Sequence, residues 1–288
     1  MGIQVSIHAG HDKESSTITA AGIMLHIITD KERSTFGIDD NALKQAVETY
    51  FGQRPTDAYL HSPTPWGDLY QSYNWSQVQT VLNVKNATIL EITSEPTIIA
   101  TKSFTNNSDK PATFIASITD EVSNTSTSSW SQTDTVSFEQ SVSYEISFLG
   151  TGAGGETTLS YSHEWGREDS ESKTVTVGSE SGVSVDLGPN ESVEVQLSAS
   201  RGVMKAVIEY EATLTGVTAL NYESKYKDHH FWGLDIHNVM RAAGIPLTQT
   251  FTETIEIGYY DSSKIVLIGP TDGQKVSFSL PHPLAVPS

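Results

Sequence analysis

Two stretches of strict alternation, joined by a glycine-rich segment, constrain this chain more than any other feature. Polar and apolar residues alternate over residues 135–148, with Gln140 as the only break, and again over residues 158–165. A period of two places successive side chains on opposite faces of a β-strand, so the pattern predicts an amphipathic β-hairpin over about residues 135–165. The apolar faces of the two arms match only if the connection holds an even number of residues or contains a bulge.

The two faces of the predicted hairpin differ in chemistry. One face is apolar and consists of Phe138, Val142, Tyr144, Ile146, Phe148, Leu159 and Tyr161. The other face carries hydroxyl and carboxylate groups and consists of Ser137, Glu139, Ser141, Ser143, Glu145, Ser147, Thr158, Ser160, Ser162 and Glu164. An ordinary antiparallel sheet, covered on one side and solvated on the other, shows the same alternation.

Three properties favour a membrane-crossing hairpin over an ordinary sheet. The alternating arms span 14 and 8 residues, beyond and close to the roughly 9–11 residues that a tilted strand needs to cross a bilayer. The polar face is small and hydroxylic, as in barrels whose polar side chains face a water-filled lumen. No Lys or Arg occurs from Pro111 to Gly166, and a segment that passes through a membrane avoids fixed positive charge.

Composition narrows the possible classes of function. The chain of 288 residues is long enough to bury a core, and its lack of cysteine excludes disulfides and thiolate metal sites. A formal net charge of -18 argues against binding of nucleic acid through general electrostatics. No apolar run approaches the ~18 residues of a transmembrane helix, and no signal peptide is visible, so we expect a soluble protein.

Period two extends over most of the remaining chain and predicts a mainly β protein with long antiparallel strands. Two segments have helical spacing instead. Residues 39–51 begin with Asp39 and Asp40 as possible N-caps, and residues 234–244 begin with Asp235 as the N-cap. The helical content is therefore a small addition to a β-rich fold.

A change in composition near residue 85 predicts two modules. Aromatic residues are concentrated before it, whereas long strands rich in Ser and Thr follow it. We expect residues 1–85 to form a small α/β head, joined by residues 221–248. Residues 86–288 are then expected to form an elongated β module that contains the hairpin.

The order of these segments resembles that of the aerolysin-like β-pore-forming proteins, particularly the branch of epsilon-toxin and the mosquitocidal toxins. A Ser/Thr-rich strand leads into the hairpin over residues 124–148, and a second one follows over residues 157–178. A Pro-turn hairpin and a long strand then span residues 185–216. The resemblance covers residues 90–216 and implies an elongated, mainly β, aerolysin-like fold with long twisted antiparallel strands.

The resemblance also implies a function. Such proteins are secreted or stored as soluble monomers, bind a receptor on a target membrane, assemble into a ring and convert one hairpin per subunit into two strands of a shared barrel. The apolar face would be membrane-facing and the polar face pore-lining. Carboxylates repeated around the lumen predict a cation-selective pore. The hairpin tip would consist of Leu149, Gly150, Gly152, Gly154 and Gly155.

Other chemistry is sparse. Residues 150–155 match G-x-G-x-x-G, but a dinucleotide site requires a helix next, and the residues that follow have period two. His229, His230 and His237 match no strong zinc signature. We find no catalytic constellation, and we expect no metal, no cofactor and no enzymatic activity.

The candidates for target recognition are Trp66, Tyr70, Tyr73 and Trp75. Aromatic residues beside polar ones can stack on sugar rings or lie among lipid headgroups. The alternative is that these side chains form the core of the head, and the receptor can be a glycan, a lipid or a protein. The competing function for the whole chain is a non-lytic, lectin-like binding or storage protein whose hairpin stays locked in its sheet.

Overall fold

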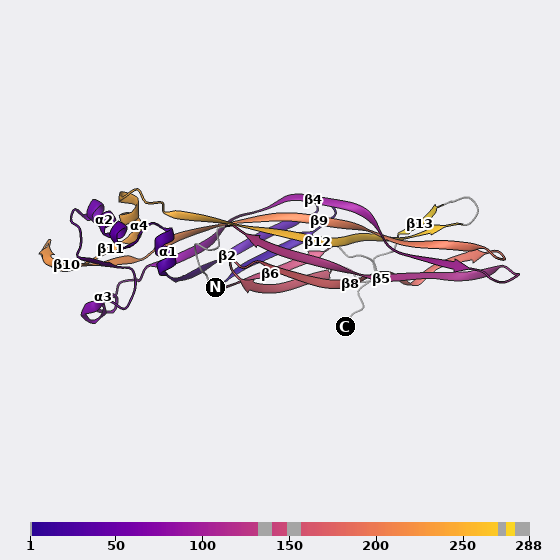
Figure 1. The fold of residues 1–288 in the computed structure, drawn as a ribbon, viewed down its shortest axis with the longest axis horizontal. Coiled ribbons are helices and arrows are strands. Elements are labelled where there is room, and N and C mark those ends of the chain that lie inside the picture. The colour runs from indigo at the N-terminus through magenta and orange to yellow at the C-terminus, as the bar shows by residue number, and fades with distance from the viewer. Residues whose placement is uncertain (1, 132–139, 149–156, 270–274, 280–288) are drawn as a thin grey trace.

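The computed structural model describes residues 2–131, 140–148, 157–269 and 275–279. The molecule is elongated, with long strands along its length and a small group of helices and short strands at one end (Figure 1). Alternating patterns that continue without a helix signal produce these long strands. The longest, β4 (Gln79–Thr105), has 27 residues. The mainly β, elongated fold expected from the sequence is confirmed.

Most strands in the described residues belong to one large sheet. They are β1 (Ile3–Ala9), β2 (Thr17–Ile27), β4, β5 (Ala112–Trp130), β6 (Ser141–Phe148), β7 (Thr157–Glu164), β8 (Asp169–Leu187), β9 (Ser192–Thr215), β12 (Thr248–Ile268) and β13 (Lys275–Ser279). Their order is β7-β6-β1-β2-β4-β9-β12-β5-β8, with β13 also paired to β12. The sheet curls back on itself, so that β7 and β8, the two ends of this order, lie close together. Lys173 of β8 donates from Nζ to the carbonyl of Thr158 in β7 at 2.6 Å.

The core follows the middle of this sheet. β9 pairs with β4 on one side and β12 on the other over nearly its whole length. Every second residue of β12 is buried from Phe251 to Leu267, which is the alternation expected of a strand with one covered face. A separate apolar cluster, which includes Val195, Leu197 and Ile265, fills another part of the long sheet.

The head forms the end of the molecule with the helices (Figure 1). Its elements are β3 (Asp57–Tyr59), β10 (Val217–Tyr226), β11 (His229–Asp235), α1 (Asp30–Thr35), α2 (Asp40–Phe51), α3 (Pro65–Tyr73) and α4 (Ile236–Ala242). The three strands form a sheet in the order β11-β10-β3. The two helices expected from the sequence are confirmed as α2 and α4, and Asp235 caps α4 by accepting a hydrogen bond from the Asn238 amide at 2.9 Å. Within the described residues, no helix has the length and apolar character to cross a membrane.

Two further helices were not expected from the sequence. α1 begins with a capping box, in which Thr29 and Glu32 bond each other's backbone amides. α3 begins at Pro65 and includes residues with left-handed backbone angles. The strands β1 and β2, which sequence analysis grouped with the head, lie in the large sheet beside β6 and β4. The division of the chain near residue 85 stays a prediction.

Candidate functional site

The amphipathic hairpin is present as β6 and β7. Its register pairs Val142 with His163, Tyr144 with Tyr161 and Ile146 with Leu159, so the apolar faces of the two arms coincide. The pair of Phe148 and Thr157 closes the described ladder, which leaves an even number of connecting residues, as the alternation requires. The segment after the glycines is a strand and not the helix that a dinucleotide site needs.

The two faces of the hairpin lie in different environments. Val142, Tyr144, Ile146, Phe148 and Leu159 are buried, and Tyr161 is half-buried. The exposed polar residues are Ser141, Ser143, Glu145, Ser160, Ser162 and Glu164, while Ser147 and Thr158 are half-exposed. Ser137, Phe138, Glu139 and the predicted tip residues Leu149, Gly150, Gly152, Gly154 and Gly155 lie outside the described residues. The roles of both faces in a membrane stay predictions.

The apolar face of the hairpin packs on the opposite layer of the curled sheet. The ring of Phe148 lies 6.2 Å from that of Tyr259 in β12, and the Tyr161 hydroxyl lies 2.8 Å from Ser126 Oγ in β5. Trp165, directly after β7, packs edge-on against Phe251 at 5.2 Å. Because each large apolar side chain contributes roughly 1.5–3 kcal/mol when buried, exposing this face to water would be costly.

A buried carboxylate lies inside this contact. Glu253 of β12 is 0% exposed, and its Oε1 accepts hydrogen bonds from Tyr144 Oη of the hairpin at 2.6 Å and from Ser128 Oγ of β5. Its Oε2 accepts from Tyr210 Oη of β9 at 2.6 Å. Burial raises the pKa of Glu253, although the three hydroxyl donors oppose that shift.

Glu253 is not among the site residues predicted from the sequence, although the sequence contains a signal for it. In "TFTETIEI" it occupies the same alternating positions as Phe251, Ile255 and Ile257, so it is an acid on the inward face of a strand. An ionisable residue at such a position must find partners in the core.

His163 extends the polar contacts along the hairpin. The side chain is buried, its Nε2 lies 3.1 Å from Tyr144 Oη, and its Nδ1 lies 3.7 Å from Asp169 Oδ2 of β8. Since the Tyr144 hydroxyl donates to Glu253, its oxygen is available to accept from an Nε2–H of His163. Burial lowers the pKa of His163, and the nearby Asp169 and Glu171 oppose this shift.

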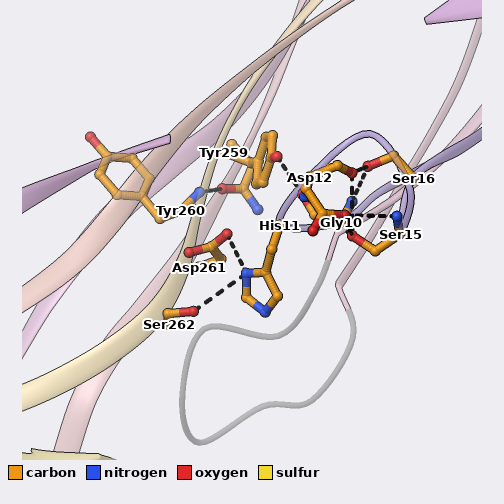
Figure 2. A network of polar contacts seen from close by, with 10 residues as sticks. Gly10, His11, Asp12, Ser15, Ser16, Tyr259, Tyr260, Asp261 and Ser262 are labelled. Carbon is orange, nitrogen blue, oxygen red and sulfur yellow. Dashed lines mark hydrogen bonds and ion pairs between the residues drawn. The ribbon is translucent and has the colours of Figure 1, made fainter. Parts of the chain in front are cut away.

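The open edge of β6 is covered by β1. The two strands pair in parallel from Ile3 with Val142 to Ala9 with Phe148. The turn after β1 is fixed to β12: Figure 2 shows His11 Nδ1 at 2.8 Å from the buried Asp261 carboxylate and Tyr259 Oη donating to the Gly10 carbonyl at 2.6 Å. β1 is therefore held on the long sheet by contacts that do not involve the hairpin.

The structure separates the four aromatic candidates in the head. Tyr70 is buried and donates to the carbonyls of Tyr59 and Val217, so it belongs to the core of the head. Trp66 is 49% exposed and Tyr73 is 50% exposed. Trp75 is half-buried and stacks on Tyr73 with ring centroids 4.7 Å apart.

Trp66 has an unusual backbone. It adopts φ 61° and ψ 41°, and Asp68 two residues later also has a positive φ of 64°. A bulky residue in the left-handed region is strained, and such strain is concentrated at functional sites. Its indole packs against Phe231 with ring centroids 5.1 Å apart, beside a depression that is also lined by Asn221, Glu223 and His230.

Among the described residues, no group of three or more His, Asp and Glu side chains is placed to hold a metal ion. The histidines singled out in the sequence have other contacts. His230 Nδ1 lies 2.9 Å from the Tyr222 carbonyl, and His237 Nδ1 lies 3.1 Å from Arg241.

Comparison with known proteins agrees with this architecture. No protein-family model matches the chain. The fold is similar to that of parasporin-2, a Bacillus thuringiensis toxin that recognizes cancer cells, with a TM-score of 0.65 and 19% identity over 90% of this chain and 100% of that chain. The elongated, mainly β, aerolysin-like fold expected from the resemblance is therefore confirmed.

Sequence relatives place the chain more narrowly. It is 36% identical over 258 residues to U-megalopygitoxin(8)-Mc8 from Megalopyge crispata, which covers 90% of this chain and 88% of that protein. It is 35% identical over 258 residues to U-megalopygitoxin(8)-Mo12 from Megalopyge opercularis, with the same coverage. The chain belongs to the U-megalopygitoxin(8) family.

The burial of His163 generates a prediction about pH. A histidine whose pKa is lowered in the packed hairpin favours its neutral form there, so packing loses stability as pH falls through the ordinary value of 6.5. Hydrogen exchange of the β6 and β7 amides in the soluble protein, corrected for intrinsic rates, should show opening that increases on acidification. His163→Gln should remove this acid-side increase, whereas His229→Gln, at an exposed position in the head, should leave it unchanged. Equal acid-side opening in wild type and His163→Gln would contradict the assignment.

Proposed function

We propose that this protein forms pores in target-cell membranes. It acts from outside the target cell as a soluble monomer, secreted or stored until use, which binds the membrane, assembles into a ring with copies of itself and inserts one hairpin per subunit into a shared β-barrel. The observation that carries this proposal is the β6–β7 hairpin, whose apolar face is buried in the monomer and whose exposed face holds hydroxyls and carboxylates without Lys or Arg.

The physics of the bilayer explains why assembly must accompany insertion. Every backbone polar group in lipid needs a partner, and strands achieve this only in a closed barrel. A lone hairpin would expose both of its edges, so the unit that inserts is a ring. In that ring the apolar face now packed on β5 and β12 would contact lipid, and the face now in water would line the lumen.

The contacts of β1 indicate where the hairpin separates. β1 is fixed to β12 through His11 and Asp261, so it is expected to stay behind when β6 leaves. A disulfide between Gln4→Cys and Ser143→Cys, which are exposed register partners, should therefore block pore formation. The natural chain has no cysteine, so the two introduced cysteines can form a disulfide only with each other within one molecule. Dye release from liposomes of cell-derived lipid should be lost when the pair is oxidised and should return on reduction.

The control for this tether is a disulfide between strands that stay together. Thr213→Cys with Thr248→Cys joins register partners of β9 and β12 and should leave dye release unchanged in both redox states. Release that survives the oxidised β1–β6 tether would contradict separation of the hairpin from β1. Absence of release by the wild-type protein, with intact binding to cells and only monomer on a gel, would favour the non-lytic binding or storage protein.

The charges on the polar face predict the selectivity of the pore. Glu145 and Glu164 are exposed, and the exposed Arg167 lies 3.5 Å from Glu164. Repeated around a ring, these carboxylates would attract cations into the lumen.

Glu145→Lys should weaken or invert the cation preference. The reversal potential in a salt gradient across a planar bilayer measures this preference, and the wild-type pore should favour cations. Ser143→Thr, a neutral change at the neighbouring outward position, serves as the matched control. A wild-type pore that favours anions would overturn the assignment of the lumen face.

We propose that the head contacts the target through the two exposed aromatic side chains of α3, Trp66 and Tyr73. The support is the half-exposed Trp66, which has a strained backbone conformation and packs against Phe231, and Phe231 in turn packs against Tyr73. The receptor is a surface molecule with an exposed apolar face, which aromatic side chains can cover.

Trp66→Ala should reduce binding to target cells by tenfold or more, on the order of a lost interface hot spot. Its melting temperature should remain close to that of the wild type, because the indole is half-exposed and its backbone is strained. Tyr50→Ala, which removes an exposed aromatic from α2, is the control and should bind normally. A large loss of thermal stability without a specific loss of binding would assign Trp66 to the core of the head.

A further inference from the structure

The contact between the hairpin and the body contains the buried acid Glu253. Among the described residues, the partners of the Glu253 carboxylate are hydroxyl groups and not cations. Two of those donors, Ser128 and Tyr210, belong to β5 and β9, the strands that flank β12. The third, Tyr144, belongs to the hairpin. Of the three hydrogen bonds to Glu253, only the one from Tyr144 would be broken when the hairpin leaves.

We propose that Glu253 is a positioning residue that sets how readily the hairpin leaves the body of the monomer, and that ionisation of its carboxyl favours departure. The inference rests on the proposed insertion of the hairpin and names the group in the soluble monomer that controls it.

The geometry gives Glu253 two opposed effects on packing. The hydrogen bond from Tyr144 Oη at 2.6 Å holds the hairpin and is strongest to a charged carboxylate. Burial under the hairpin removes water from the same carboxylate, which penalises the charged form. When the hairpin leaves, Glu253 keeps the donors from Ser128 and Tyr210 and regains water on the exposed side.

Burial is the larger of the two effects, since the pKa of Glu253 is raised above its ordinary value of 4.5. An acid with a raised pKa in the packed state contributes stability that is fully present below the ordinary value. That contribution is lost as pH rises through the raised pKa. Ionisation therefore weakens packing, and the hairpin should open more often as pH rises.

In the part of the chain that the structure describes, no Lys or Arg acts on Glu253. Tyr144 faces it from β6, Tyr161 and His163 lie beyond from β7, and Tyr210 faces it from β9. Asp169 and Glu171 of β8 act on Tyr161 and His163 and add negative charge to the neighbourhood. His163 has the opposite pH dependence: its protonation weakens the packing of the hairpin as the pH falls, whereas ionisation of Glu253 weakens it as the pH rises.

The test compares two substitutions on the same hydrogen bond in the protein in solution, without membranes. Glu253→Gln keeps the shape but cannot ionise, and Tyr144→Phe removes the hairpin's hold on the carboxylate. Hydrogen exchange of the β6 and β7 amides, corrected for intrinsic rates, is followed from about pH 5 to about pH 9. One proton linked to opening changes the opening equilibrium by up to about tenfold per pH unit within the window between its two pKa values.

In the wild type, hairpin opening should be least at an intermediate pH and should increase as the pH rises above that point. In Glu253→Gln this rise should be absent, while the acid-side behaviour due to His163 should remain. In Tyr144→Phe opening should be greater than in the wild type, and the excess should grow with pH. Glu256→Gln, an exposed acid on the same strand, is the matched control and should follow the wild type at every pH.

A purely structural role predicts a different result. If Glu253 only fills space and bonds its neighbours, both substitutions should increase opening by an amount that does not depend on pH, and the proposal is overturned. If Glu253→Gln does not fold, the Tyr144→Phe variant provides the test. Additional opening relative to the wild type that grows with pH supports the proposal, and additional opening that is constant with pH overturns it.

This experiment uses no membrane, so it separates the two proposals. A wild type that releases dye but shows the same pH dependence as Glu253→Gln retains the proposed function and overturns the role of Glu253. A wild type that never releases dye but opens with a rise that Glu253→Gln abolishes retains the role of Glu253 and overturns the proposed function.

Discussion

The apolar face of the β6–β7 hairpin has to be covered, and the rest of the structure depends on that constraint. In the monomer the strands β5 and β12 cover the face, and β1 pairs with the open edge of β6. In the proposed pore, lipid would cover the same face and neighbouring hairpins the same edges. Because this apolar area is covered in both states, it contributes little to the free-energy difference between the monomer and the proposed pore. The polar contacts of the hairpin then contribute most of that difference.

Those polar contacts are of a kind that weakens the packed state. A buried ionisable group is usually less favourable than a well-packed apolar one of the same size. At the place where the hairpin meets β12, the chain has Glu253, Tyr144 and His163 instead of aliphatic residues. The contact is thus expected to be less stable than its area would allow and to respond to protons, which suits the departure of the hairpin in the proposed function.

The sequence predicted the hairpin well because its signal is local. Alternation alone assigns each residue of β6 and β7 to a face and fixes the even parity of the connection. Cap residues located α2 and α4 in the same way. α1 was missed although Thr29 and Glu32 form a capping box, because its 6 residues are too few to show a helical period.

The parts that sequence did not predict are those set by distant residues. The parallel pairing of β1 with β6 joins Ile3 to Val142, and no local pattern specifies such a partner. The different exposure of Tyr70 and Trp66 depends on the left-handed backbone at the start of α3, which the aromatic pattern does not reveal. Glu253 left a signal as an acid among inward residues, but its partners come from β5, β6 and β9.

The β1–β6 ladder explains why the hairpin is stored as part of a sheet. Strands with unpaired edges associate with other chains, and a free amphipathic hairpin would do so before reaching a membrane. Pairing with β1 removes that edge, and the anchored turn around His11 keeps β1 in place. The ladder's backbone hydrogen bonds are regained only when another copy offers an equivalent strand. In the proposed function, contact between subunits therefore has to precede release, because the neighbour supplies the partners that β1 gives up.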